Sequence, residues 1–394
     1  MHLEPKRELP RRIKHILYFI GFLFTVHVAA TDFINSSYLE QFIGLDKIGL
    51  LYIIASLLSI IIVSNLGTLF AKFGNFATML TFIIVALLAL TGLSFTSIPI
   101  LAIAFFVIHY SIIVVSRTNF DIYLEQVSTH KNIGETRGSY LSSVNLAWFL
   151  APLLIAFVLR DSVIYQRMYL VSIFIVLVVV VLLFATIRHV KVRHRPSKPF
   201  WRTAKVLLHD GHIAKIILIR FLMNFFFAWM TIYTPIYLHE TIGFDWKILG
   251  VIFSIMLLPY VLFEMPLGKI TDKFGGEKEI LIVGLVIMAV SVIIMPLITV
   301  ASIPLWIGVL FLSRIGASFV ESMSEIYFFR KISPTNTNAI ELFRDSDPLA
   351  YIIAPLSASI ILIFVSIDQL YFVLGAVMLV AIIIGLRLNG KHEH

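Results

Sequence analysis

Stretches of about 20 apolar residues recur along the whole chain, and this feature restricts the possible fold more than any other. That length is what an α-helix needs to cross the hydrocarbon core of a bilayer. Because no water is available there, a spanning segment must satisfy its backbone hydrogen bonds internally. The stretches are continuously apolar rather than alternating, so helices fit them better than the strands of a barrel. The sequence therefore predicts an all-α polytopic membrane protein.

The composition and the spacing of these stretches agree with this fold class. The 394 residues are 59% hydrophobic and 14% charged, whereas a soluble protein is about half apolar and about a quarter charged. An even number of spans would put both termini on one side of the membrane. We predict twelve spanning helices, at residues 14–37, 46–70, 76–96, 98–126, 137–159, 165–187, 212–238, 246–270, 279–299, 303–329, 339–364 and 367–388.

The basic residues indicate which side holds the termini. Most of the 31 Lys and Arg residues lie in segments that share the side of the N-terminus. Positive residues gather on the cytoplasmic side of membrane proteins, so we predict that both termini are cytoplasmic. The same rule accounts for the net charge of +8 without a nucleic-acid partner. We expect a multi-pass protein of the plasma (inner) membrane, surrounded by lipid and acting as a monomer.

Four landmarks occur twice along the chain, in the same order and with nearly constant separation. They pair residues 38–49 with 237–250, 66–75 with 267–276, 121–128 with 325–333, and 147–156 with 350–359. The sequence therefore predicts two six-helix bundles built on one plan, at residues 1–187 and 212–394, joined by a basic cytoplasmic linker at 188–211. Internal repeats of this kind are typical of transporters, whose binding site lies where the repeats meet.

The turn between the second and third helices of each half combines glycine with charged residues. It reads LGTLFAKFGN in the first half and LGKITDKFGG in the second. Glycine permits close approach of a neighbouring helix and the backbone angles of a tight turn. The residues concerned are Gly67, Lys72, Gly74, Gly268, Asp272, Lys273 and Gly275. This pattern resembles the G-x3-D-[RK]-x-G cytoplasmic loop motif of the major facilitator superfamily, although Ala71 stands where the first copy should have Asp.

The resemblance covers the whole chain, because the six-plus-six topology and the basic central linker also fit that family. It implies two helical bundles that expose a central cavity alternately to each side of the membrane. It also implies that the loop motif acts as a conformational latch, which holds in one state and opens in another. The alternative for each turn is an ordinary solvated connection between two helices.

Ionisable side chains within the predicted spans are costly in a bilayer and therefore mark candidate functional positions. In the first helix, His27, Thr31 and Asn35 share one face, and Asp32 lies beside that face. The resemblance implies that the first helix of each half lines the cavity. A hydrated position near the outer mouth is the alternative for Asp32. We predict a substrate- or proton-binding set that comprises His27, Asp32, Asn35, Glu264, Arg314 and Glu321.

Arg314 is the most informative member of this set. It lies about eleven residues into its predicted helix, which places it near the midplane at about 1.5 Å of rise per residue. A buried arginine either holds an anionic group of the substrate or neutralises a carboxylate such as Glu321. The sequence leaves both roles open.

The fourth and tenth predicted helices each carry a stripe of charged residues. Arg117 and Asp121 lie four residues apart and can pair within their helix. Glu321 and Glu325 occupy the corresponding positions in the second half. Opposite charges at symmetry-related positions predict a cytoplasmic gate that joins the two halves, formed by Arg117, Asp121 and Glu325 with Glu321. The alternative is a static ion-pair network that holds the bundle together.

The sequence carries no signal for enzymatic chemistry. It has no cysteine, and it lacks both the G-x4-GK[ST] nucleotide-binding loop and the His/Glu spacing of zinc proteases. We therefore expect no cofactor, no metal and no enzymatic activity. A carboxyl group in an apolar cavity can load and release protons, so a proton gradient is the predicted energy source.

The predicted function is secondary active transport of a small molecule by alternating access, with proton-coupled export of amphipathic compounds as the favoured form. The alternative is proton-coupled symport or facilitated uptake of a small anionic solute or nutrient. In that case Arg314 and His27 would supply a positively charged pocket.

Overall fold

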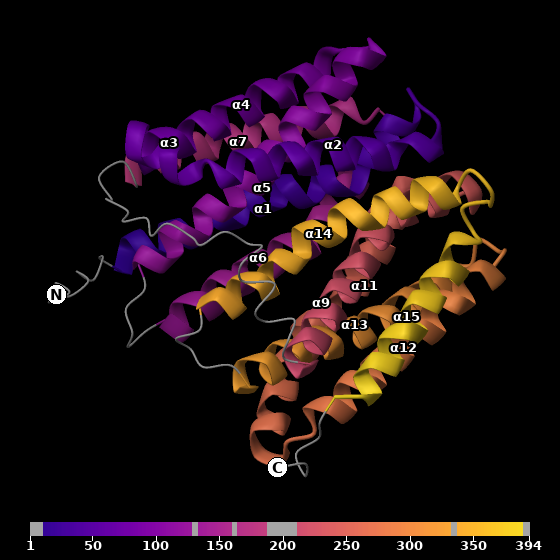
Figure 1. Cartoon of the computed structure of the whole chain (residues 1–394). Helices are drawn as coiled ribbons and strands as arrows, with labels where there is room; N and C mark the ends of the chain where they lie inside the picture. The colour runs from indigo at the N-terminus through magenta and orange to yellow at the C-terminus, as the bar shows by residue number, and fades with distance from the viewer. Residues whose placement is uncertain (1–10, 128–132, 160–163, 187–210, 332–336, 389–394) are drawn as a thin grey trace, which may run out of the picture. The chain divides into compact units, whose positions relative to one another are not determined.

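The computed structural model describes residues 11–127, 133–159, 164–186, 211–331 and 337–388. Helices dominate these residues, and none of them lies in a β-strand (Figure 1). The chain divides into two compact units. Unit 1 comprises Met1–Ile43 with Ile54–Pro196, and unit 2 comprises Gly44–Ile53 with Ser197–His394. The predicted all-α fold class is confirmed, whereas the predicted linker at 188–211 lies outside the described residues except for Gly211.

Unit 1 is built around the first helix of the chain, which packs against α6 and α7 and also contacts α5. A second layer forms where α4 packs between α5 and α7. The elements are α1 (Arg11–Glu40), the part of α2 (Leu45–Ser64) from Ile54 onward, α3 (Leu66–Phe73), α4 (Asn75–Phe95), α5 (Pro99–Val127), α6 (Ile133–Val158) and α7 (Gln166–Thr186). The predicted span at 46–70 is interrupted at Asn65, where α2 gives way to α3.

Unit 2 is built around α13, which packs against α11, α12 and α9, while α9 also contacts α14 and α15. The elements are α9 (Gly211–Ile232), α10 (Thr234–Ile236), the π-helix η1 (Tyr237–Thr241), α11 (Trp246–Phe274), α12 (Glu277–Ile294), the 3-10 helix η2 (Met295–Leu297), α13 (Ile303–Lys331), α14 (Thr337–Ile361) and α15 (Leu370–Leu386). Figure 1 shows α12, α13 and α15 side by side in orange and yellow, in agreement with their contacts.

Many of these helices have the length and the surface that a bilayer requires. In the described part of the chain, nine helices are long and apolar enough to cross a membrane, and Ser142–Val158, Leu349–Ile361 and Leu370–Leu386 are shorter apolar helices. Large apolar side chains are exposed along them, for example Phe157 at 72% and Phe174 at 68%. Acyl chains can cover such a surface, whereas water cannot do so without cost. The predicted total of twelve spans and the cytoplasmic termini stay predictions.

Glycine backbone angles shape both of the repeated turns. Gly74 ends α3 with φ 80°, and Gly275 and Gly276 connect α11 to α12 with φ 73° and 92°. Positive φ is strained for residues with a Cβ atom, so these positions favour glycine. The prediction that the KFGG turn needs glycine for its backbone angles is therefore confirmed.

Candidate functional site

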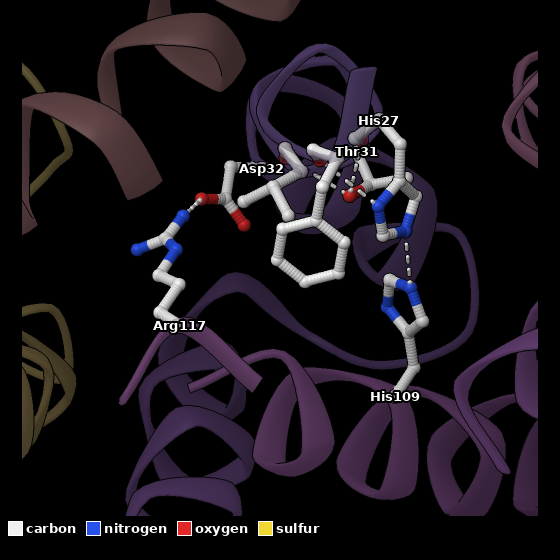
Figure 2. A network of polar contacts seen from close by, with 7 residues as sticks. His27, Thr31, Asp32, His109 and Arg117 are labelled. Atoms are coloured by element: carbon white, nitrogen blue, oxygen red, sulfur yellow. Dashed lines mark hydrogen bonds and ion pairs between the residues drawn. The ribbon is translucent and has the colours of Figure 1, made fainter. Parts of the chain in front are cut away.

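Two histidines meet inside unit 1, where α1 and α5 approach each other. The Nε2 atoms of His27 and His109 lie 3.0 Å apart, and the two rings meet edge to face at 81°. Both side chains are 0% exposed. Figure 2 shows the two rings facing each other from their separate helices. His109 lies on the fourth predicted helix, but it was not among the predicted site residues.

Hydrogen bonding assigns the neutral tautomers of this pair. The Nδ1 atom of His27 lies 3.3 Å from the carbonyl oxygen of Phe24, which can only accept, so this nitrogen carries the hydrogen. The Nε2 atom of neutral His27 is then an acceptor, and Nε2–H of His109 donates to it. His109 Nδ1 therefore keeps a lone pair. This nitrogen is enclosed and has no hydrogen-bond partner among the described residues.

Other polar groups on α1 continue the same buried face. The Thr31 hydroxyl lies 3.0 Å from the carbonyl oxygens of His27 and Val28, so it stays satisfied within its helix. Asn35 accepts a hydrogen bond of 2.9 Å from the Tyr169 hydroxyl. The predicted shared face of His27, Thr31 and Asn35 is buried within unit 1, and all three side chains are 0% exposed.

Asp32 forms an ion pair with Arg117. Arg117 Nη2 lies 3.3 Å from Asp32 Oδ2, and the side chains are 47% and 14% exposed, respectively. The structure gives Arg117 a partner on α1 (Figure 2). The suggested pairing of Arg117 with Asp121 in its own helix stays a prediction. The side chain of Asp121 lies outside the described residues. The network therefore links α1 to α5 twice, through the two histidines and through this ion pair.

Unit 2 contains an ion pair between its first helix and α13. Arg220 Nη1 on α9 lies 3.5 Å from Glu321 Oε1, and the guanidinium of Arg220 also lies over the ring of Phe343. Arg220 was not among the predicted site residues. An arginine inside a predicted span was a sufficient signal to find it, by the same rule that selected Arg314.

Arg314 lies on α13 and is 4% exposed. Its guanidinium carbon Cζ lies 5.4 Å from the ring centroid of Phe226 and 5.4 Å from that of Phe227. Its Nε atom is enclosed and has no hydrogen-bond partner in the part of the chain that the structure describes. Because Glu321 contacts Arg220 instead, the described contacts provide no carboxylate for Arg314.

Two of the remaining predicted charged residues have described side chains. Glu325 is exposed on α13, and Lys72 is exposed beside the ring of Phe73. Glu264, Gly67, Gly268, Asp272 and Lys273 fall within helices, but their side chains lie outside the described residues. The cytoplasmic gate across the two halves and the latch function of the turns stay predictions. Within the described residues, no group of three or more His, Cys, Asp or Glu side chains could hold a metal ion.

A family model provides a comparison for the whole sequence. The model described as the Major Facilitator Superfamily matches residues 17–258 and 247–394. These two matches together cover nearly the whole chain. Among curated protein sequences, none matches.

Solved structures with the same fold include three transporters of low sequence identity. The nucleoside transporter NupG is 12% identical with a TM-score of 0.75, and the match covers 95% of this chain and 98% of that one. An auto-inhibited POT family peptide transporter is 12% identical with a TM-score of 0.73, covering 98% and 99%. A bacterial homologue of the human lysosomal transporter Spinster, inward-facing and unoccupied, is 11% identical with a TM-score of 0.70, covering 95% and 94%. At these identities the likeness establishes the fold alone.

Proposed function

Because the chain belongs to the Major Facilitator Superfamily, we propose that it is a proton-coupled secondary transporter that moves a small molecule by alternating access. Family membership makes the protein a membrane transporter rather than an enzyme. The coupling ion is the proton, the direction of transport is export, and the location is the plasma membrane. The protein acts as a monomer in the plasma membrane and exports amphipathic compounds in exchange for protons.

The observation that carries proton coupling is the contact between His27 and His109. Imidazole is the side chain whose ordinary titration range spans neutral pH, so it is suited to taking up and releasing protons there. The enclosed lone pair on His109 Nδ1 provides a place for an added proton, and the Nε2–Nε2 hydrogen bond provides a path to the second ring. A pair of rings can thus hold one proton more in one transport state than in another.

The ion pair of Asp32 and Arg117 supplies a means to connect this proton to movement. Arg117 contacts Asp32, which lies five residues from His27 on the same helix, so a proton on the histidine pair repels the guanidinium. Protonation of Asp32 would remove the attraction that holds Arg117 against α1. Either event weakens a link between α1 and α5. A proton can therefore bias the packing of two helices, which is the differential interaction that a population shift requires.

The transport experiment uses full-length protein reconstituted in liposomes that contain a pH-sensitive dye. A panel of amphipathic compounds is added outside, and both compound flux and proton flux are recorded with and without an imposed pH gradient. We expect a transported compound to drive proton flux in the wild type, and His109→Asn to abolish that flux. His15→Asn is the matched control, since His15 is an exposed histidine of the same helix as His27. Proton coupling is contradicted if compound flux is the same with and without the pH gradient and is also unchanged in His109→Asn, Asp32→Asn and Glu321→Gln.

The direction is tested in cells that express the chain and are loaded with a fluorescent amphipathic dye. Export predicts that cells with the wild type retain less dye than cells with Asp32→Asn. The sequence feature that leans toward export is Pro152 inside α6, which resembles the proline of the Gly-Pro motif in antiporters of the family, although Ala151 stands in place of the glycine and Pro355 follows an alanine in the same way. Equal retention of the dye in both cell lines would contradict an exporter.

Uptake of a small anionic solute is the second candidate function. The observation in its favour is Arg314, a buried cation without a described carboxylate partner. Accumulation of a radiolabelled anion by wild-type cells, lost in Arg314→Gln but kept in Asp32→Asn, would favour uptake over export.

A further inference from the structure

We propose that the Arg314 guanidinium binds the anionic group of an amphipathic organic anion, a carboxylate or a phosphate monoester, whose apolar part lies against Phe226 and Phe227. This inference rests on the proposed transport of amphipathic compounds and specifies their charge. It assigns the binding group to unit 2, whereas the groups assigned to proton coupling, His27, His109 and Asp32, lie in unit 1.

In the absence of a ligand, the free-energy cost of burying the Arg314 charge is only partly offset by its described contacts. Arginine stays charged in proteins, so burial cannot be relieved by loss of a proton. An arginine at the centre of a spanning helix costs about 2.5–3.5 kcal/mol even on the most lenient scale. A cation over an aromatic ring recovers about 0.5–2 kcal/mol. Two rings at 5.4 Å therefore reduce the cost, but among the described residues the enclosed Nε donor of Arg314 still has no hydrogen-bond partner.

Two carboxylates on the same helix as Arg314 have described side chains, and neither is paired with Arg314 among the described contacts. Glu321, which the sequence offered as a partner, lies 3.5 Å from Arg220 on another helix. Glu325 on α13 is exposed, whereas Arg314 is 4% exposed. The two roles that the sequence left open are thus no longer equal, because the described contacts favour an anion from outside the chain.

The surroundings of Arg314 specify more than a negative charge. A guanidinium that lies over aromatic rings uses its flat faces and keeps its N–H edge for a carboxylate or phosphate, which it can bind through two hydrogen bonds. Phe226 and Phe227 lie near each other with ring centroids 5.7 Å apart, and the ring centroid of Phe227 lies 6.3 Å from that of Tyr260. An anion bound here meets an apolar, aromatic wall. Such a site favours an organic anion over a strongly hydrated inorganic ion.

The internal repeat relates the position of Arg314 to that of the histidine pair in unit 1. Tyr38 and Tyr237 are equivalent landmarks 199 residues apart, and the same offset takes His27 to Phe226. Asp121 and Glu325 are 204 residues apart, and that offset takes His109 to Ser313, the neighbour of Arg314. The contact of Phe226 with Arg314 therefore corresponds, within one residue, to the contact of His27 with His109. In both units the first and fourth helices of the bundle meet at a buried basic group.

The binding experiment uses the full chain in lipid nanodiscs at one pH, with no gradient. Titration calorimetry compares each anion with its neutral isostere: 4-phenylbutyrate with 4-phenylbutanamide, octanoate with octanamide, and benzyl phosphate with benzyl alcohol. Inorganic phosphate and sulfate are titrated alone. We expect the wild type to prefer at least one organic anion over its neutral partner. In Arg314→Gln this preference should fall by roughly 10- to 100-fold, the effect of losing hydrogen bonds to a charged group.

Three further variants distinguish the effect of the Arg314 charge on anion preference from effects of packing and of misfolding. Lys247→Gln removes an exposed cation of unit 2 and should leave the preference unchanged. Arg314→Lys keeps the positive charge but cannot form two parallel hydrogen bonds, so it should give an intermediate preference for the anion. This variant also tests the proposal if Arg314→Gln does not fold. Phe227→Leu should weaken the binding of the anion and the binding of its neutral isostere by the same factor, so the ratio of the two affinities should stay the same.

The outcomes decide between the proposal and its rivals. A wild type that prefers no organic anion over its neutral isostere overturns the proposal, as does a preference that survives in Arg314→Gln. Inorganic phosphate or sulfate that binds as tightly as the organic anions would make this an inorganic-anion site and overturn the assigned class. Because no gradient is applied, the binding experiment does not depend on proton coupling. Anion binding can therefore be observed even if proton-coupled flux is absent, and proton-coupled flux can be observed even if anion binding is absent.

Discussion

The Nε2 atoms of His27 and His109 lie 3.0 Å apart, although 82 residues separate them in the sequence. Neither ring is exposed, and each belongs to a different helix of unit 1. Two imidazoles that are this close cannot both present a hydrogen to the other, so their tautomers are coupled. The carbonyl oxygen of Phe24 fixes the first tautomer, and the first fixes the second.

This coupling predicts the protonation pattern of both rings in the resting protein. Neutral His27 should carry its hydrogen on Nδ1, and neutral His109 should carry its hydrogen on Nε2. Solid-state NMR of protein with isotope-labelled histidine in lipid distinguishes protonated from bare ring nitrogens. The spectrum of His109→Asn, subtracted from that of the wild type, should show the loss of a protonated Nε2 and a bare Nδ1.

The matched control for this spectrum is His15→Asn, which removes an exposed histidine of the same helix as His27. It should leave the signals of the buried pair in place. A bare Nδ1 on His27, or a protonated Nδ1 on His109 in the neutral state, would contradict the assignment.

The ion pair of Asp32 and Arg117 should contribute little to stability. Arg117 is 47% exposed, and pairs that water can reach typically contribute about 0.2–1 kcal/mol. A double-mutant cycle with Asp32→Asn and Arg117→Gln, followed by unfolding in detergent, should give a coupling free energy in that range and a smaller value at high salt. A coupling of several kcal/mol would mean that the pair holds the bundle together instead of serving a switch.

The sequence was sufficient to predict the fold because the relevant signals are local. The apolar stretches, the basic residues between them and the repeated landmarks all follow from residue order, and the helices fall within the predicted segments apart from shifts at their ends. The break at Asn65 was not predicted, because the apolar pattern continues through it. Helix ends and interruptions depend on a few backbone hydrogen bonds, which composition does not reveal.

The pairing of side chains was harder to predict because it depends on how helices cross. Arg117 pairs with Asp32, which lies 85 residues away and which the spacing of Arg117 and Asp121 along one helix could not reveal. Spacing along one helix identifies which residues share a face, but it does not identify the residue that another helix presents to that face. The same limit applies to Glu321, whose partner Arg220 belongs to a helix that the sequence did not connect with it.

A close crossing of α12 and α13 predicts a large effect from a single methyl group. A Cβ atom added at Gly316 would lie 2.5 Å from the carbonyl oxygen of Gly284 and 2.8 Å from the backbone nitrogen of Met288. Backbone atoms cannot move aside as flexible side chains do, so the helices must separate. Gly316→Ala should lower the free energy of unfolding by about 1–3 kcal/mol, the usual cost of overpacking.

Gly308→Ala is the matched control for this crossing, because it lies on the same helix and an added Cβ atom there meets nothing within 4 Å. It should be neutral or slightly stabilising, since alanine is the better helix former. Thermal unfolding of both variants in detergent provides the comparison. Equal stabilities would show that α12 and α13 are not in close contact at Gly316.

The turn between α11 and α12 predicts a penalty that arises from backbone angles alone. Gly276 has φ 92° and ψ 22°, in the left-handed region, and an added Cβ atom would meet Glu279 Oε2 at an ordinary 3.7 Å. Space is therefore available, and only the backbone conformation opposes a side chain. Gly276→Val should cost about 1–2 kcal/mol, whereas Gly276→Asn should cost clearly less because asparagine tolerates this region. Thermal unfolding that ranks the wild type above Asn and Asn above Val would support this account. Equal losses for both variants would point to crowding or a changed turn, because a purely conformational cost must distinguish the two residues.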